Sequence, residues 1–346
     1  MTLRIGFLGT GSMGLSHVQL VRDEFPSDRV EIAAVCDTHA PNLAKAIEAA
    51  PKAQAFEDPR RLIAAPGVDA IIISTPGFTH ADFTESALAA GKHVFAEKPV
   101  MTTRDGCRRM LDAARKHPDK ILVIHHELRY SKYFRKIKDL ISGGEVGEVQ
   151  LVWCKEFRGP FLKKVGDWIQ DARLSGGCLV DKNCHHFDLL NWWVASRPSK
   201  VCGFGGNDVV RVVNNEHEVI DHASVSFQYE NGVRGGLLLS MFSPNTGEDL
   251  EMGVIGDRGM LQTRLSRDEI LQWLRGDESA EPIVHHVASR KAGWGAHHGF
   301  IEAHEAFFRA VERGERALTD VRDCVDGTLL AIAAEEAIKS GTVVDV

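Results

Sequence analysis

The feature that most constrains this chain is a glycine-rich turn near its beginning. The apolar run Ile5–Leu8 leads directly into the segment Gly9–Gly14, which reads GTGSMG, and a helix is expected to begin near Leu15. The six letters alone are weak evidence, but a strand before them and a helix after them form the context of a dinucleotide-binding turn. The sequence therefore predicts that the chain begins with a doubly wound α/β domain.

Each glycine of this turn has a separate task. Gly9 permits the tight turn after the strand, and Gly11 lets the backbone approach a pyrophosphate. Gly14 lets the helix and the strand pack closely. Ser12 and Met13 complete the predicted phosphate-binding segment, in which the N-terminus of the helix receives the phosphate charge.

An acidic residue follows the second predicted strand. Asp37 comes twenty-three residues after Gly14, where its carboxylate would accept hydrogen bonds from the adenosine ribose hydroxyls. The same carboxylate would repel a 2′-phosphate. Its neighbours Thr38 and His39 include no arginine. The sequence therefore predicts NAD rather than NADP as the cofactor.

The rhythm of apolar segments divides the chain into two parts. Up to Ile124, short apolar runs alternate with amphipathic segments, which is typical of a parallel sheet covered by helices. The runs are Ile5–Leu8, Val30–Val35, Ala70–Ile73, His93–Ala96 and Ile121–Ile124. Strand-like runs without intervening helices follow at Val201–Phe204, Ala223–Tyr229, Gly235–Met241 and Leu250–Ile255. We therefore predict a Rossmann domain over residues 1–124 and, over residues 125–346, an α+β domain with a large, mostly antiparallel open sheet.

Composition excludes several classes of function. The net charge is −7 and the chain has no basic runs, so the charge pattern does not indicate binding of nucleic acid. No apolar stretch approaches the roughly 18 residues of a membrane span. The seven cysteines are scattered and never in a Cys-x-x-Cys spacing, which is typical of reduced thiols in the cytoplasm. Adjacent histidines such as His125 and His126 point apart, so we expect no metal site. The expected partner is a small molecule.

Two further motifs lie downstream of the glycine turn. The first is Ala96–Pro99, which reads AEKP and follows a predicted strand at the sheet edge where doubly wound folds bind ligands; the segment Ser74–His80 precedes it. The second, Asp181–Asp188, reads DKNCHHFD and opens a helix expected from about Asp181 to Val194. In this order the three motifs resemble those of the Gfo/Idh/MocA family of sugar and cyclitol dehydrogenases, over essentially the whole chain.

The resemblance implies roles for three residues. Lys98 would reach the hydroxyl that is oxidised, His185 would accept its proton, and Asp181 would orient that histidine or bind an adjacent hydroxyl. The chemistry agrees, because the base needs a pKa near neutrality and an ammonium stabilises an oxygen that gains alkoxide character. Asp181 and His185 are four residues apart and would share one face of the expected helix.

The remaining candidates lie in segments expected to border the cofactor or the substrate. The cofactor set also contains Thr75, Pro76, His80, Glu97 and Lys98. The substrate set also contains Glu127, Arg129, Tyr130, Arg158, Lys163, Lys164, Trp168, Arg173 and Lys182. Its many cations would suit an anionic sugar, although solvated surface charge is at least as good an interpretation for Lys163 and Lys164.

The resemblance leaves three functions open. The first, which we favour because it is the commoner activity in this fold, is a dehydrogenase that releases an oxidised sugar or polyol and NADH. The second is an NAD-dependent glycosidase that oxidises its substrate transiently, eliminates the aglycone, adds water and returns the hydride, for example on a sulfoquinovoside. The third, a non-catalytic sugar sensor, is disfavoured because all three catalytic positions are retained. Asn183, Gly77 and Glu127 depart from the usual family pattern and leave the substrate open. A homodimer or homotetramer that pairs through the open sheet is also implied.

Overall fold

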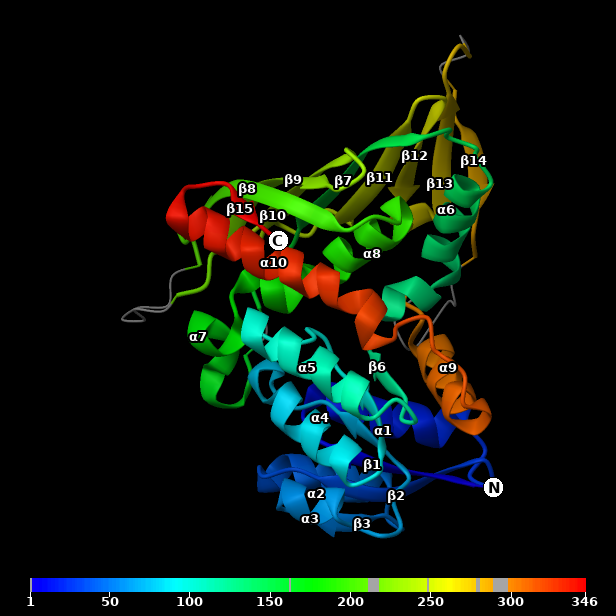
Figure 1. The fold of residues 1–346 in the computed structure, drawn as a ribbon, viewed down its shortest axis with the longest axis vertical. Helices are drawn as coiled ribbons and strands as arrows, with labels where there is room; N and C mark the ends of the chain where they lie inside the picture. Colours follow the sequence, from blue (N-terminus) through cyan, green and yellow to red (C-terminus); the bar gives the residue numbers. More distant parts are fainter. Residues whose placement is uncertain (1, 162, 211–217, 248, 278–280, 289–297) are drawn as a thin grey trace. The chain divides into compact units, whose positions relative to one another are not determined.

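The structure is a computed structural model that describes residues 2–161, 163–210, 218–247, 249–277, 281–288 and 298–346 (Figure 1). Its internal contacts divide the chain into two compact units. The N-terminal unit comprises residues 1–127 and 300–325, and the C-terminal unit comprises residues 128–299 and 326–346.

The N-terminal unit is built on a six-stranded parallel sheet in the order β3-β2-β1-β4-β5-β6. The strands are β1 (Leu3–Leu8), β2 (Val30–Cys36), β3 (Gln54–Phe56), β4 (Ala70–Ile73), β5 (His93–Ala96) and β6 (Leu122–Ile124). The order reverses between β1 and β4, which is the switch point at which such sheets bind ligands. The predicted doubly wound sheet is confirmed. The short strand β3 was missed because two of its three residues are exposed, so it lacks an apolar run.

Helices cover this sheet, which explains why its central strands are apolar on both faces. The helices are α1 (Ser12–Glu24), α2 (Ala40–Ala49), α3 (Pro59–Ile63), α4 (His80–Ala89), α5 (Arg104–Lys116) and α9 (Phe300–Arg313). The side chains of β4 are 0% exposed throughout. Helix α5 begins where the hydroxyl of Thr103 accepts the N–H of Gly106 at 3.1 Å, an N-cap. Both sheet faces therefore lie in the core.

The C-terminal unit contains a nine-stranded sheet in the order β14-β13-β12-β11-β7-β10-β9-β8-β15. The strands are β7 (Val149–Phe157), β8 (Pro198–Gly206), β9 (His222–Tyr229), β10 (Arg234–Ser240), β11 (Leu250–Gly256), β12 (Gly259–Arg264), β13 (Glu269–Leu274), β14 (Ile283–His286) and β15 (Val344–Asp345). Neighbouring strands are antiparallel except for the parallel pair β7 and β10. The predicted large, mostly antiparallel open sheet is confirmed.

Helices pack on one face of this sheet. They include α6 (Lys132–Ser142), α8 (Cys184–Val194) and most of α10 (Val321–Ser340), while the short α7 (Ala172–Ser175) lies in the irregular stretch before α8 (Figure 1). Inward side chains alternate along the strands, as Val225 and Phe227 do on β9. Within the described part of the chain, every helix is too short or too polar to cross a membrane.

Candidate active site

The turn between β1 and α1 has the shape that a pyrophosphate needs. Gly9 has a φ of +83°, a conformation that favours glycine. A Cβ on Gly14 would lie 1.9 Å from the carbonyl oxygen of Gly9, so this close approach of helix and strand requires glycine. A Cβ on Gly11 would instead meet only the side-chain amide of Asn42, at 3.8 Å. The backbone at Gly11 is therefore open to a ligand, and the turn fits the pyrophosphate of a dinucleotide.

The carboxylate of Asp37 is fixed beside this turn at the end of β2. Its Oδ2 accepts the backbone N–H of Thr10 at 2.8 Å, and its Oδ1 accepts the backbone N–H of His39 at 2.8 Å. The amide of Asn42 donates to Oδ2 at 3.3 Å. These donors orient a carboxylate that remains partly exposed. The remaining lone pairs of its two oxygens can accept hydrogen bonds from the ribose hydroxyls of a dinucleotide.

Cofactor preference is expected to depend on Asp37. The double substitution Asp37→Ser with Thr38→Arg should lower kcat/KM with NAD roughly 10- to 100-fold, since a hydrogen bond to a charged group contributes about 1.5–3 kcal/mol. It should raise kcat/KM with NADP, because the carboxylate that repels the 2′-phosphate is removed and the new guanidinium attracts that phosphate. The measurement is kcat/KM for both cofactors, with Asp37→Asn as the control that removes charge but keeps an acceptor oxygen. Equal use of both cofactors by the unmodified protein would contradict this assignment.

His80 joins the loops that follow β4 and β5. Its buried ring lies between two carbonyl oxygens, with Nε2 3.0 Å from that of Thr75 and Nδ1 2.9 Å from that of Pro99. The hydroxyl of Thr75 contacts that of Thr79 at 2.6 Å. The loop after β4, which includes Pro76, is therefore held against the segment that carries Lys98. These contacts place the predicted cofactor residues of both loops at one edge of the sheet.

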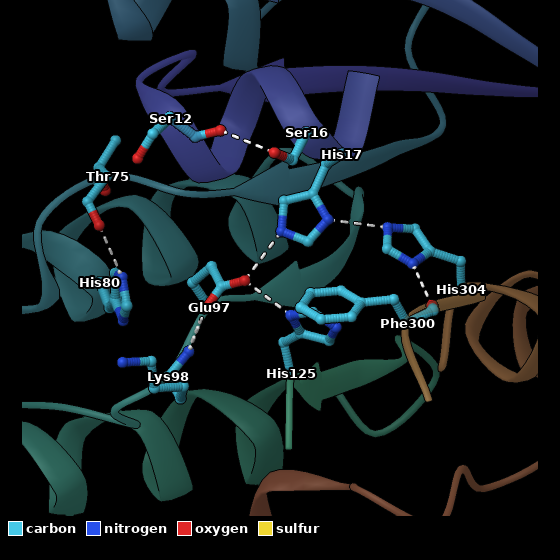
Figure 2. A network of polar contacts seen from close by, with 10 residues as sticks. All are labelled: Ser12, Ser16, His17, Thr75, His80, Glu97, Lys98, His125, Phe300 and His304. Atoms are coloured by element: carbon cyan, nitrogen blue, oxygen red, sulfur yellow. Dashed lines mark hydrogen bonds and ion pairs between the residues drawn. The ribbon is translucent and has the colours of Figure 1, made fainter. Parts of the chain in front are cut away.

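Glu97 is almost fully buried and faces two histidines. Its Oε1 lies 2.8 Å from Nε2 of His17 and 2.6 Å from Nδ1 of His125, and its Oε2 accepts the backbone N–H of Lys98 at 3.2 Å (Figure 2). Burial alone would raise its pKa, but the two histidines hold the pKa of Glu97 well below its usual range. Lys98 is partly exposed between buried neighbours. Glu97 thus supports the backbone of Lys98, while a direct contact of Glu97 with the cofactor stays a prediction.

The segment that carries Asp181 differs from the expected helix. Leu179–Asn183 forms a turn of π-helix, and α8 begins only at Cys184. Its first N–H, that of Leu179, donates to Oε1 of Glu335 on α10 at 2.8 Å, and burial raises the pKa of Glu335 to about 7. The helix predicted from about Asp181 to Val194 is present, but its first turn is π-helical; a single wider turn leaves the apolar pattern unchanged, so the sequence did not reveal it. Such turns are frequent at functional sites.

Asp181 and His185 stand on successive turns of this segment. Asp181 is 8% exposed and donates its backbone N–H to the carbonyl of Gly177 at 3.1 Å. His185 is partly exposed, whereas the adjacent His186 is buried and faces Glu156. The two histidines thus point apart. The role of His185 as the proton acceptor remains a prediction.

Glu156 is a central residue that sequence reasoning missed. Its carboxylate accepts the side-chain amide of Asn183 at 2.9 Å and forms ion pairs with Lys182 at 3.2 Å and Arg158 at 3.7 Å. Burial would raise its pKa, but Lys182, His186 and Arg158 together lower the pKa of Glu156. The sequence did contain an indication of this role, since Glu156 is a carboxylate at an inward position in the alternating pattern of β7. Asn183, at a position that is usually glycine in the family pattern, here ties the π-helical turn to that strand.

Arg129 forms a buried ion pair with Asp188. Its Nε lies 2.7 Å from Oδ2 and its Nη2 lies 2.6 Å from Oδ1 of that carboxylate. The side chains are 4% and 1% exposed. This bidentate pair holds the segment before α6 against α8 and neutralises the guanidinium.

The other predicted substrate residues lie in varied surroundings. Arg173, the second residue of α7, is exposed and forms an ion pair at 2.6 Å with Asp171, the N-cap of that helix. Glu127 is buried in the N-terminal unit. Tyr130 is buried, Trp168 and Lys164 are partly exposed, and Lys163 is exposed. A role for any of them in substrate binding stays a prediction.

Known protein families match both units. The model described as "Oxidoreductase family, NAD-binding Rossmann fold" matches residues 3–125, and the model described as "GFO/IDH/MocA C-terminal domain" matches residues 134–262. Both matches follow the order of motifs that the sequence carries.

Several known proteins are similar in sequence or in fold. An inositol 2-dehydrogenase of Serratia proteamaculans is 30% identical over 193 residues, and the chain spans about half of its length (54%). An inositol 2-dehydrogenase of Rhizobium meliloti is 27% identical over 346 residues, which cover 98% of this chain and 97% of that protein. A crystal structure of scyllo-inositol dehydrogenase from Lactobacillus casei, with bound NAD(H) and scyllo-inositol, has a TM-score of 0.83 at 21% identity over 100% of this chain and 99% of that one, which shows a common fold.

Three observations point to the same family. They are the glycine turn between β1 and α1, the Glu97-Lys98-Pro99 segment after β5 and the two family matches. The chain belongs to the Gfo/Idh/MocA family of oxidoreductases.

Proposed function

We propose that the protein is an NAD-dependent dehydrogenase that removes a hydride from a ring hydroxyl carbon of a cyclitol such as an inositol. The observation that carries the proposal is the cradle at Gly9–Gly14 beside the oriented carboxylate of Asp37, with Lys98 following β5 at the same sheet edge. The names of the relatives support the substrate class, since they are inositol 2-dehydrogenases. The retained Asp181 and His185 supply the acid–base groups that such a reaction needs.

The proposed mechanism assigns one task to each side chain. NAD, when bound, supplies the hydride acceptor. The ammonium of Lys98 would donate a hydrogen bond to the substrate oxygen and stabilise its alkoxide character. A ring nitrogen of His185 would accept the hydroxyl proton, and Asp181 would orient that ring or bind an adjacent hydroxyl. Glu97 would keep the backbone of Lys98 in place through its 3.2 Å hydrogen bond.

The redox stoichiometry tests this proposal against the glycosidase alternative. With myo-inositol or scyllo-inositol, we expect one NADH in solution for each molecule consumed, so that the reaction stops when NAD is exhausted. A panel of glycosides, assayed for aglycone release in deuterated water, serves as the comparison. Many aglycones released per NAD, with no net NADH and with solvent deuterium next to the oxidised carbon, would instead establish a glycosidase.

The ion pairs of the C-terminal unit favour a neutral substrate. The anionic-sugar hypothesis depended on a group of cations expected to border the pocket. Arg129 is paired with Asp188, while Lys182 and Arg158 share the carboxylate of Glu156. Asp188 compensates the charge of Arg129, and Glu156 compensates one of the two charges of Lys182 and Arg158, which supports a polyol rather than a sulfonated or carboxylated sugar.

Association of the chain with a second copy is also part of the proposal. Strand pairing places Leu151, Phe204, Leu238 and Ile255 on one face of the nine-stranded sheet, where they are 40%, 84%, 47% and 38% exposed. An apolar face of this kind is typical of an interaction surface. Light scattering at micromolar concentration should give at least twice the subunit mass of 38.1 kDa, and Phe204→Glu should lower it. A monomer would contradict this assembly. The seven cysteines, all within the described residues, form no disulfide and six of them are buried, which supports a cytoplasmic location.

A further inference from the structure

Four buried side chains of the N-terminal unit form a chain of polar contacts, named here the histidine cluster (Figure 2). They are His17 of α1, Glu97 after β5, His125 after β6 and His304 of α9. Nδ1 of His304 lies 2.7 Å from the carbonyl oxygen of Phe300, and its Nε2 lies 3.0 Å from Nδ1 of His17. Nε2 of His17 and Nδ1 of His125 then meet Oε1 of Glu97 at 2.8 and 2.6 Å.

The number of protons in this chain follows from which atoms can donate. The carbonyl of Phe300 and the carboxylate of Glu97 only accept, so each of the three contacts between them needs a proton from an imidazole. Two neutral imidazoles carry one N–H each. His17 and His304 together therefore need a third proton, which makes one of the two rings an imidazolium. His125 needs none, because the Nδ1–H of a neutral ring satisfies its contact with Glu97.

The surroundings make the missing proton costly. His17, His125 and His304 are at most 1% exposed, and the ring of Phe95 lies 4.9 Å from that of His304 between centroids. Without the third proton, Glu97 would be an uncompensated buried anion, and the lone pairs of His17 and His304 would face each other at 3.0 Å. With it, the carboxylate and the imidazolium form a neutral group.

Several charged groups act on the cluster. Burial lowers the pKa of His17 and of His304, and this opposes the third proton. Burial also opposes protonation of His125, but Glu97 outweighs it and raises the pKa of that ring, with further opposite contributions from Glu127 and Lys98. Charge alone would thus favour His125 as the cation. The hydrogen-bond chain favours the His17–His304 pair, because only a proton there removes the lone-pair contact.

We propose that the His17–His304 pair stores this proton and that the stored proton makes Glu97 a positioning residue for Lys98. Held by His17 on one side, Glu97 keeps its Oε2 on the backbone N–H of Lys98. Loss of the proton weakens the contacts through which His304 of α9 and His17 of α1 hold Glu97. The backbone of Lys98, which is hydrogen-bonded to Glu97, then becomes less well fixed. The part concerning Lys98 rests on the proposed dehydrogenase function, whereas the stored proton does not.

The direct test is ¹⁵N NMR of histidine side chains in the full-length protein saturated with NAD. At pH 7.5 we expect one buried imidazole pair with three protonated nitrogens, assigned by its loss in His304→Leu and its persistence in His117→Leu, a control at the end of α5. Resonances of two neutral rings at His17 and His304 would overturn the stored proton. This readout needs no turnover, so it stands even if the proposed activity fails.

The pH profile of turnover tests the positioning role. In the unmodified protein, kcat should fall at alkaline pH with the same midpoint at which the NMR signal of the pair is lost, while KM for NAD changes less than about twofold. In His304→Leu, kcat should be several-fold lower and that alkaline step should be absent. A kcat profile unrelated to the NMR titration would overturn the link to Lys98 while leaving the stored proton intact.

A bound metal ion is the competing interpretation of the same side chains. His17, Glu97 and His125 each offer a ligand atom within 4.8 Å of the others. A cation there would exclude the shared protons, because its ligands must be deprotonated. Stoichiometric zinc in the purified protein, absent from His17→Leu, would overturn the stored proton; less than a tenth of an equivalent supports it.

Discussion

Replacing Lys98 with methionine, or His185 with alanine, is expected to lower kcat with an inositol roughly 100-fold or more. The loss of a general base or of a charge that stabilises a developing oxyanion typically has an effect of this size. NAD affinity should remain within a few-fold, because the proposed dinucleotide-binding residues, the glycine turn and Asp37, lie at another part of the N-terminal unit. Both quantities are measured on the same samples, kcat by NADH absorbance and affinity by fluorescence titration.

Controls for this pair of substitutions come from exposed residues of the same type. Lys52→Met and His286→Ala change an exposed lysine and an exposed histidine in the N-terminal and C-terminal units, and both should retain full turnover. Unimpaired turnover in Lys98→Met or His185→Ala would refute the role assigned to that residue. A large loss of NAD affinity in Lys98→Met would instead make the lysine a cofactor-binding residue.

The second large effect is expected at the buried pair of Arg129 and Asp188. Arg129→Met should lower the free energy of unfolding of the C-terminal unit by about 3–5 kcal/mol, because it leaves a buried carboxylate uncompensated. The double variant Arg129→Met with Asp188→Asn should recover part of this loss, since it removes both charges. Urea denaturation followed by tryptophan fluorescence gives both values, and Trp192 lies close enough to report, 5.9 Å from the guanidinium.

An exposed ion pair serves as the matched control. Arg173 and Asp171 form a similar contact at 2.6 Å, but the arginine side chain is 65% exposed. Arg173→Met should therefore change the free energy of unfolding by less than about 1 kcal/mol. If Arg129→Met cost no more than Arg173→Met, the buried pair would have no special part in stability.

The parallel sheet and the dinucleotide turn were predicted from local sequence alone. Strands such as β4 are buried on both faces and therefore appear as uninterrupted apolar runs. The turn at Gly9–Gly14 could be recognised because its backbone shape is possible only with glycine at two positions, and that requirement is local. Asp37 followed from its place at the end of the second strand, whereas the role of Lys98 was implied only by the resemblance to the family.

Other features were decided only by the tertiary structure. The π-helical turn at Leu179–Asn183 leaves the apolar pattern unchanged, and its contact with Glu335 joins residues 156 positions apart. His17 and His304 meet across 287 positions, and residues 300–325 pack with the N-terminal unit. Local sequence determines backbone conformation and which side of an element is apolar, because both depend on residues within a few positions. Which buried polar groups meet, and hence which protons and charges they share, depends on how distant elements pack and on their register, and no local pattern encodes that.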